Sequence, residues 1–146
     1  MRGRDSSGPE TDRWERKDWW GITLEAPDPH ALLAFWSAIL DKPIWNETET
    51  GGSLDLLEGV ASLAVQLADV YEPPVWPPEP GRPGMQLHLE VEVTDLGAAV
   101  EHAVELGATL ADHQPQDGVR VMLDPAGHPF CLFLDESMTT TPAEPR

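Results

Sequence analysis

Two stretches of the chain alternate apolar and polar residues and then run into a helix start. They cover residues 19–26 and 86–93. Alternation with a period of two predicts half-buried strands. Each stretch is followed by an aspartate, Asp28 or Asp95, whose side chain can accept a hydrogen bond from the first turn of a helix, and apolar residues then recur at helical spacing. The same strand–helix unit is therefore predicted twice.

Three short strands are expected after each helix. In the first half, glycine-containing pairs separate the apolar runs, and turns are predicted at Gly51-Gly52 and Glu58-Gly59. In the second half, residues 124–127, Asp-Pro-Ala-Gly, are typical of a turn. The pattern thus predicts one βαβββ unit that occurs twice. The strands expected after the helices cover residues 44–48, 53–57, 60–67, 108–111, 118–123 and 128–134.

The chain is predicted to hold one domain made of two modules, residues 18–67 and 85–134. Residues 68–84 between them contain six prolines. Proline at this density excludes a helix or a central strand, so the segment is predicted to be a stiff, extended linker. Residues 1–17 are expected to form a disordered or loosely docked arm, and residues 135–146 a disordered tail.

The chain is strongly acidic, with a formal net charge of −17. Only 9 Lys and Arg residues stand against 26 Asp and Glu residues, which argues against nucleic acid and against anionic membrane surfaces as partners. The acidity either keeps the protein soluble or attracts a cationic small molecule. A single cysteine allows no intrachain disulfide, and the sequence contains neither an apolar run of membrane-spanning length nor a signal-peptide pattern. A cytoplasmic location is therefore expected.

Three segments carry a resemblance to a known superfamily. They are the strand and helix start at residues 88–95, His-Leu-Glu-Val-Glu-Val-Thr-Asp, the helix end at residues 105–108, Glu-Leu-Gly-Ala, and the hairpin at residues 124–133, Asp-Pro-Ala-Gly-His-Pro-Phe-Cys-Leu-Phe. With these the chain resembles the vicinal oxygen chelate (VOC) superfamily, which includes glyoxalase I, extradiol dioxygenases and bleomycin-resistance proteins. It is similar to the small glyoxalase-like proteins of bacteria. The resemblance implies an α+β fold in which tandem βαβββ modules form a U-shaped sheet trough with helices on the outer face (the glyoxalase/bleomycin-resistance fold).

The resemblance also implies where a metal would bind. Metal enzymes of the superfamily place one ligand on each of four strands, and the corresponding places here are Gly21, Gln66, His88 and Cys131. Gly21 has no side chain, Gln66 offers a neutral amide oxygen, and Cys131 stands where the family has glutamate. A divalent site needs three or four converging donors, so no metal cofactor is expected, and His88 and Gln66 are weak candidates for a divalent metal. Glu90 lies about 7 Å along the strand from His88 and would have to reach back to join it.

The first functional hypothesis is a glyoxalase-like protein that binds a small cationic or polar aromatic molecule in the trough, with antibiotic sequestration as one form of it. Acidic residues expected on the trough face favour a cation. The alternative is a VOC-type enzyme, a lyase, isomerase or dioxygenase, with a degenerate or absent metal site, in which His88 would be the catalytic residue. A third hypothesis is an assembly module without a ligand. The predicted ligand-binding residues are Gln66, His88, Glu90, Cys131 and Phe133, with Trp45 and Trp76 at the rim.

Several of these residues also have ordinary structural interpretations. His88 could be a polar residue hydrogen-bonded within a wet trough, and Cys131 a small buried apolar residue. Trp45 and Trp76 could pack as any strand or linker tryptophan does. His128 follows a turn glycine and is predicted to be exposed. The resemblance further implies a homodimer.

Overall fold

The computed structural model describes residues 19–135 of the chain. The arm expected at residues 1–17 lies outside the described residues, and so does the tail expected at residues 135–146, apart from its first residue. The chain divides into two compact units between Tyr71 and Glu72, inside the proline-rich segment. Unit 1 is the N-terminal part and unit 2 the C-terminal part.

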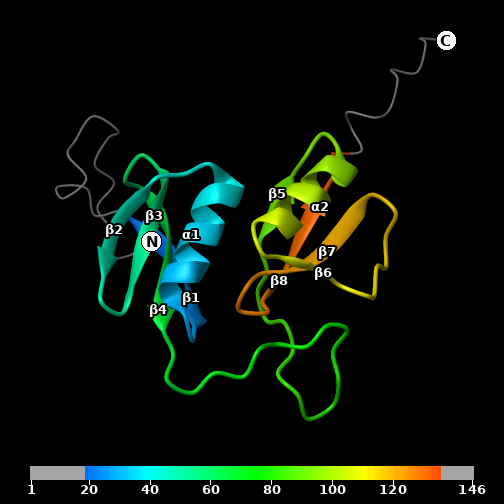
Figure 1. Cartoon of the computed structure of the whole chain (residues 1–146), viewed down its shortest axis with the longest axis horizontal. Helices are drawn as coiled ribbons and strands as arrows, with labels where there is room; N and C mark the ends of the chain where they lie inside the picture. The colour runs from blue at the N-terminus through cyan, green and yellow to red at the C-terminus, as the bar shows by residue number, and fades with distance from the viewer. Residues whose placement is uncertain (1–18, 136–146) are drawn as a thin grey trace, which may run out of the picture. The chain divides into compact units, whose positions relative to one another are not determined.

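Unit 1 is a four-stranded sheet with one helix, and its strands stand in the order β1-β4-β3-β2 (Figure 1). Strand β1 runs parallel to β4, and the other neighbours are antiparallel. This is the predicted βαβββ order. Its elements are β1 (Trp20–Ala26), α1 (Pro29–Leu40), β2 (Ile44–Thr48), β3 (Gly51–Leu57) and β4 (Ala61–Leu67).

Unit 2 repeats the plan, with strand order β5-β8-β7-β6. Strand β5 runs parallel to β8, and the other pairs are antiparallel. The predicted α+β class and the tandem βαβββ arrangement are therefore confirmed. Its elements are β5 (Glu90–Glu92), α2 (Leu96–Glu105), β6 (Thr109–Leu110), β7 (Val119–Leu123) and β8 (Pro129–Phe133). Neither helix in the described part of the chain has the length and apolarity needed to cross a membrane.

Both helices begin where the sequence predicts. The Asp28 side chain accepts a hydrogen bond from the backbone N–H of Ala31 at 3.0 Å, and Asp95 accepts from Ala98 at the same distance. Each cap satisfies a donor that the helix itself leaves unpaired, and such a cap typically stabilises a protein by about 1 kcal/mol.

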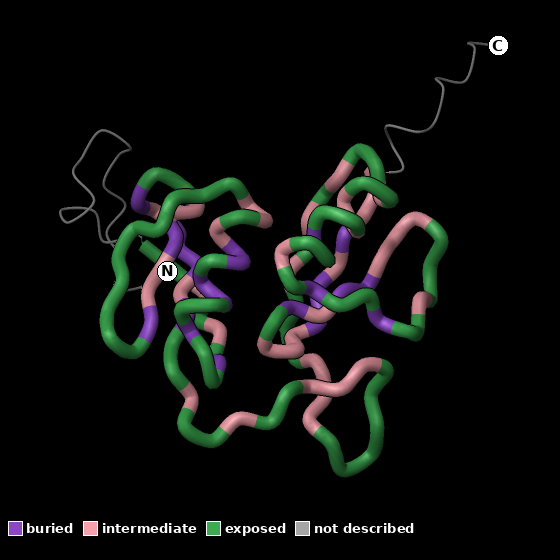
Figure 2. The backbone as a smooth tube through the Cα atoms, in the orientation of Figure 1, coloured by how far each residue is buried: buried purple, intermediate pink, exposed green. Residues whose placement is uncertain are grey.

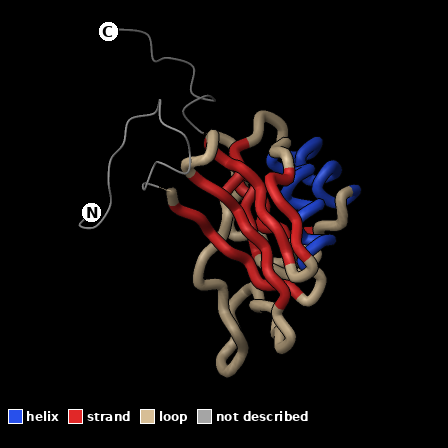
Figure 3. Tube along the Cα trace, turned by 90° about the vertical axis from the view of Figure 1, so that its left-hand side faces the viewer, coloured by secondary structure: helices blue, strands red, loops and turns tan. Residues whose placement is uncertain are grey.

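In each unit the core lies between the helix and one face of its sheet. Figure 2 shows the buried backbone segments concentrated there, and Figure 3 shows the helices to one side of the strands. Alternation along β8 explains this in unit 2, because Phe130 and Leu132 are buried while Cys131 between them is only partly buried and points to the other face. The face of each sheet away from its helix is therefore available for other contacts. Buried core side chains include Leu32, Leu33, Phe35, Trp36, Leu54, Leu63 and Val65 in unit 1 and Ala103, Met122, Phe130 and Leu132 in unit 2.

The predicted turn at Gly51-Gly52 is wrong by two residues. The turn falls at residues 49–50, and both glycines belong to β3. A Cβ at Gly51 would lie 2.0 Å from the carbonyl oxygen of Val65, and one at Gly52 would lie 2.5 Å from Leu33 Cδ2. These glycines are thus needed for close packing within the sheet and against α1, and not for a turn.

The strand predicted at residues 86–93 is shorter than expected, since β5 covers only Glu90–Glu92. Hydrogen bonds extend its pairing by one residue at each end, to Leu89 and Val93. His88 consequently precedes the strand and does not lie within it.

The proline-rich segment contains no helix or strand, as predicted, but it is not simply extended. Val75 bridges to Gly84, and the Val75 N–H donates to the carbonyl oxygen of Pro83 at 2.8 Å. The segment therefore folds back on itself as a loop. Trp76 lies near its start, and its Nε1 donates to the backbone oxygen of His113 at 3.1 Å, which holds the loop on the rest of unit 2.

Candidate functional site

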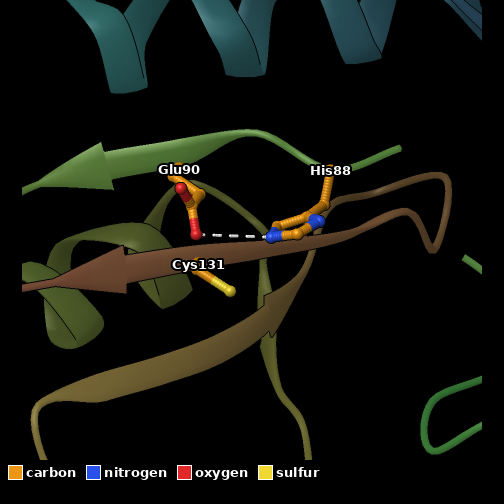
Figure 4. A group of neighbouring side chains, drawn as sticks. All are labelled: His88, Glu90 and Cys131. Carbon is orange, nitrogen blue, oxygen red and sulfur yellow. Dashed lines mark ion pairs between the residues drawn. The ribbon is translucent and has the colours of Figure 1, made fainter. Parts of the chain in front are cut away.

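Three potential donor side chains gather on one face of unit 2. They are His88, just before β5, Glu90 on β5 and Cys131 on β8, and their donor atoms all lie within 4.8 Å of one another. His88 Nε2 is 3.4 Å from Glu90 Oε1 (Figure 4). The side chain of His88 is 33 % exposed and that of Glu90 64 %. The cluster is thus accessible from outside the unit.

The register of the sheet brings these side chains together. Glu90 and Cys131 are direct partners in the parallel pair of β5 and β8, so their side chains leave the sheet on the same face. His88 stands two residues before Glu90, and its ring turns back along the edge of the sheet toward the carboxylate (Figure 4). The separation of about 7 Å expected along the strand is therefore bridged by the side chains themselves.

The electrostatics of the cluster favour a neutral thiol in the ligand-free protein. Burial raises the pKa of Cys131, and the negative charge of Glu90 raises it further. A thiol in this state is a weak nucleophile. The cluster does not resemble an activated-cysteine site.

A pocket of about 290 Å³ opens beside the cluster. Neither lysine nor arginine is among the residues that line it. Glu90 supplies the only carboxylate among the lining residues, and Trp76 supplies a flat aromatic surface. The lining consists of Trp76, Met85, His88, Glu90, Pro115, Gln116, Val119, Val121 and Cys131.

The remaining predicted ligand-binding residues lie elsewhere. Trp45 and Gln66 line a pocket of about 370 Å³ in unit 1, where Gln66 Nε2 donates to Glu25 Oε1 at 3.0 Å. Phe133 lines a different pocket of unit 2, of about 490 Å³, which it shares with Glu90. Of the predicted residues, the structure therefore brings together Trp76, His88, Glu90 and Cys131 around one pocket.

The two units do not carry equivalent donors at equivalent positions. When Asp28 and Asp95 are aligned along the sequence, the positions of His88, Glu90 and Cys131 correspond to Gly21, Thr23 and Ala64. The strand pairing agrees, because Thr23 is the partner of Ala64 as Glu90 is of Cys131. Ala64, and not Gln66, thus stands at the unit 1 position equivalent to Cys131.

The four-residue metal set implied by the resemblance does not fit unit 1. A Cβ at Gly21 would lie 2.9 Å from Ser62 Oγ and 3.1 Å from a ring carbon of Trp19, so neighbouring side chains already occupy the space of a ligand there. Gln66 is the ladder partner of Glu25, four residues along β1 from Gly21. Donors suited to a metal occur together only in unit 2, among the residues that the structure describes.

A second histidine site was missed by sequence reasoning. His128, predicted to be exposed, has a side chain only 19 % exposed, and its Nδ1 lies 2.9 Å from the enclosed carboxylate of Asp124. The same carboxylate accepts from the backbone N–H groups of Ala126 and His128 at 3.0 and 2.9 Å. An aspartate that opens an Asp-Pro turn commonly bonds the following backbone in this way, which is the signal that could have located it.

Comparison with known proteins agrees with this architecture. The model of the glyoxalase-like domain family matches residues 21–133. The chain belongs to the glyoxalase-like family of the VOC superfamily. No curated protein sequence matches this member of the family significantly.

Solved structures show the same fold at low identity. A glyoxalase/bleomycin resistance protein/dioxygenase family enzyme from Burkholderia phytofirmans is 16% identical, with a TM-score of 0.58 over 78% of this chain and 95% of its own. A glyoxalase-related enzyme from Fulvimarina pelagi is 19% identical, with a TM-score of 0.59 over 80% and 86%. A genomically encoded fosfomycin resistance protein from Listeria monocytogenes is 17% identical, with a TM-score of 0.58 over 80% and 89%. These likenesses establish the fold, which in this superfamily serves several functions.

Proposed function

We propose that this glyoxalase-like protein binds a compact cationic or polar aromatic molecule in the unit 2 pocket. The observation that carries the proposal is the exposed carboxylate of Glu90 at the wall of a pocket lined by neither lysine nor arginine. An exposed carboxylate attracts cations, and the chain's net charge of −17 adds to the attraction at longer range.

The shape of the pocket supports a small aromatic group. Its volume of about 290 Å³ is at the lower end of the range for small-molecule sites. The indole of Trp76, positioned by its hydrogen bond to His113, offers a face on which a planar group can stack or a cation can rest. His88 and Gln116 supply the polar contacts that would set the orientation of the ligand.

Antibiotic sequestration is one form of this function. The Burkholderia neighbour is described as a glyoxalase/bleomycin resistance protein/dioxygenase family enzyme, and the Listeria neighbour as a fosfomycin resistance protein. Of the two kinds of drug, a cationic one suits the Glu90 carboxylate, whereas the phosphonate of fosfomycin would be repelled by it. We therefore expect compact cationic drugs, and not fosfomycin, to bind the metal-free protein.

Calorimetric titration tests the proposal with matched probes. Benzamidinium and neutral benzamide have the same shape and differ in charge, so the cation should bind more tightly. Glu90→Gln should weaken benzamidinium by about tenfold and leave benzamide unchanged. Glu101→Gln, the same change at an exposed position of α2, is the control. Equal binding of the two probes, or equal effects of the two substitutions, would disprove the proposal.

A second candidate function is a VOC-type enzyme, a lyase, isomerase or dioxygenase. The observation in its favour is the pairing of His88 with Glu90 at 3.4 Å, because a carboxylate can orient an imidazole that accepts a proton from a bound substrate. Chemical change of a bound molecule, abolished by His88→Gln, would distinguish the enzyme from the binding protein.

We also infer a homodimer in the cytoplasm. Several large apolar side chains of unit 1 are exposed, among them Trp20 at 47 % and Leu57 at 58 %, and an interface with a second copy would cover such residues. Light scattering coupled to size-exclusion chromatography checks the assembly state. A monomer at micromolar concentration would contradict it.

A further inference from the structure

We propose that His88, Glu90 and Cys131 form a binding site for a thiophilic divalent cation, with Zn²⁺ as the natural candidate, built entirely within unit 2. Nitrogen, oxygen and sulfur donors converge there within 4.8 Å of one another. This metal site goes beyond the proposed function, because either ligand could bind without the other. An organic cation requires Glu90 and Trp76, whereas the metal requires His88, Glu90 and Cys131.

The geometry is close to that of a tetrahedral site. Zinc bonds of about 2.0–2.3 Å place neighbouring donors about 3.3–3.8 Å apart. His88 Nε2 and Glu90 Oε1, at 3.4 Å, already satisfy this spacing. The largest separation in the cluster, 4.8 Å at most, has to shorten by about 1 Å, and rotation of the exposed Glu90 carboxylate and of the cysteine side chain can supply it.

The donor set favours a soft or borderline metal over Mg²⁺ or Ca²⁺. A thiolate and an imidazole suit zinc, whereas the alkaline-earth cations prefer oxygen ligands. On binding, the thiol of Cys131 releases its proton to solvent, so one thiolate, one carboxylate and one neutral imidazole compensate the charge of the dication. Three protein ligands leave a fourth coordination position, which the adjoining pocket leaves open to water or another small donor.

Comparison of the two repeats argues that the cluster is a specific feature of unit 2. At the equivalent positions unit 1 carries Gly21, Thr23 and Ala64, which supply no strong metal ligand. Cys131 and Glu90 are direct ladder partners, so their proximity follows from the backbone. Glu90 is also not one of the ligand positions that the family resemblance implies.

Cobalt substitution provides a direct readout of the site. We expect the chelator-treated full chain to bind one equivalent of Co²⁺, with a thiolate-to-cobalt charge-transfer band and the intense visible absorption of tetrahedral coordination. Zn²⁺ should displace the cobalt and abolish both. Cys131→Ser should remove the charge-transfer band, and His88→Gln and Glu90→Gln should each weaken metal binding by at least about tenfold.

Controls separate the site from adventitious binding. His102→Gln, at an exposed position of α2, should leave the titration unchanged. Because Cys131→Ser could disturb folding, the Glu90→Gln variant, altered at a largely exposed side chain, is the decisive one, and thermal unfolding of each variant is recorded. Absence of stoichiometric Co²⁺ binding, binding without a charge-transfer band, or equal loss in the His102 and Glu90 variants would each overturn the proposal.

The outcome is distinguishable from failure of the proposed function. Benzamidinium binding is measured on chelator-treated protein, so it can persist when metal binding fails. If both ligands bind, one equivalent of Zn²⁺ should weaken benzamidinium, because each uses the carboxylate of Glu90. Metal binding without benzamidinium binding would support the zinc site and disprove the proposed function.

Discussion

Replacing Asp124 by alanine is expected to destabilise unit 2 strongly. The Asp124 carboxylate lies in the turn between β7 and β8, and its side chain is 0 % exposed. It accepts the backbone N–H groups of Ala126 and His128 at 3.0 and 2.9 Å, and His128 Nδ1 lies 2.9 Å from its second oxygen. The turn also sets the start of β8, the strand that carries Cys131.

The magnitude follows from the groups left without a partner. Each hydrogen bond to a charged acceptor contributes about 1.5–3 kcal/mol, and each part-buried donor left unsatisfied costs about 1–3 kcal/mol. These terms overlap, because one carboxylate serves all three donors. Loss of this hydrogen-bonded group is therefore expected to lower the free energy of unfolding by about 3–5 kcal/mol, a large part of the roughly 5–15 kcal/mol typical of a domain. Asp124→Asn retains one carbonyl acceptor and should cost about half as much.

Urea unfolding followed by far-ultraviolet circular dichroism measures this difference. The matched control is Asp117→Ala, because Asp117 is exposed and Arg120 bonds only to its backbone oxygen among the contacts described. The control should change the free energy of unfolding by less than about 0.5 kcal/mol. An Asp124→Ala variant that lost less than about 1 kcal/mol, or no more than the control, would refute the reasoning.

Three further substitutions test unit 1. Gly51→Ala should destabilise by at least about 2 kcal/mol in chemical unfolding, because the new Cβ would lie 2.0 Å from the Val65 oxygen at a φ of +151°. Trp36→Ala, which removes a core side chain only 1% exposed, should cost about 3–5 kcal/mol in the same assay. Hydrogen bonding to Glu47 raises the pKa of His30 above its ordinary value of 6.5. The stability that this pairing adds to the folded protein is therefore fully present below pH 6.5 and is lost as the pH rises through the raised pKa. Thermal unfolding of His30→Gln should accordingly show its largest deficit at acidic pH and none in alkaline solution, and a deficit independent of pH would contradict the pairing.

Local signals predicted most of the fold. Alternation located the strands, and the two aspartate caps located the helices to the residue, because period and capping depend only on neighbours in sequence. The errors occurred where a distant segment decides the outcome. Gly51, for example, faces the backbone of Val65 on β4, a strand that is distant from it in sequence.

The candidate site was predictable only in part. His88 could be selected from the sequence as a pocket residue, and the same-face position of Cys131 followed from alternation. The closeness of Glu90 to both could not be known, because it depends on the register of β5 against β8 and on the way the His88 ring turns. The family resemblance implied Gln66 as a ligand position, whereas the ladder register makes Ala64 the unit 1 counterpart of Cys131.

The sequence by itself determined that this chain contains two βαβββ units, because hydrophobic period, capping and turn chemistry are local properties repeated along it. It also determined the acidic net charge of −17. Only the tertiary structure decided that three donors meet at one pocket of unit 2, while the equivalent positions of unit 1 carry none. Register is the physical reason, since a shift of a single residue between β5 and β8 would turn Cys131 and Glu90 to opposite faces of the sheet.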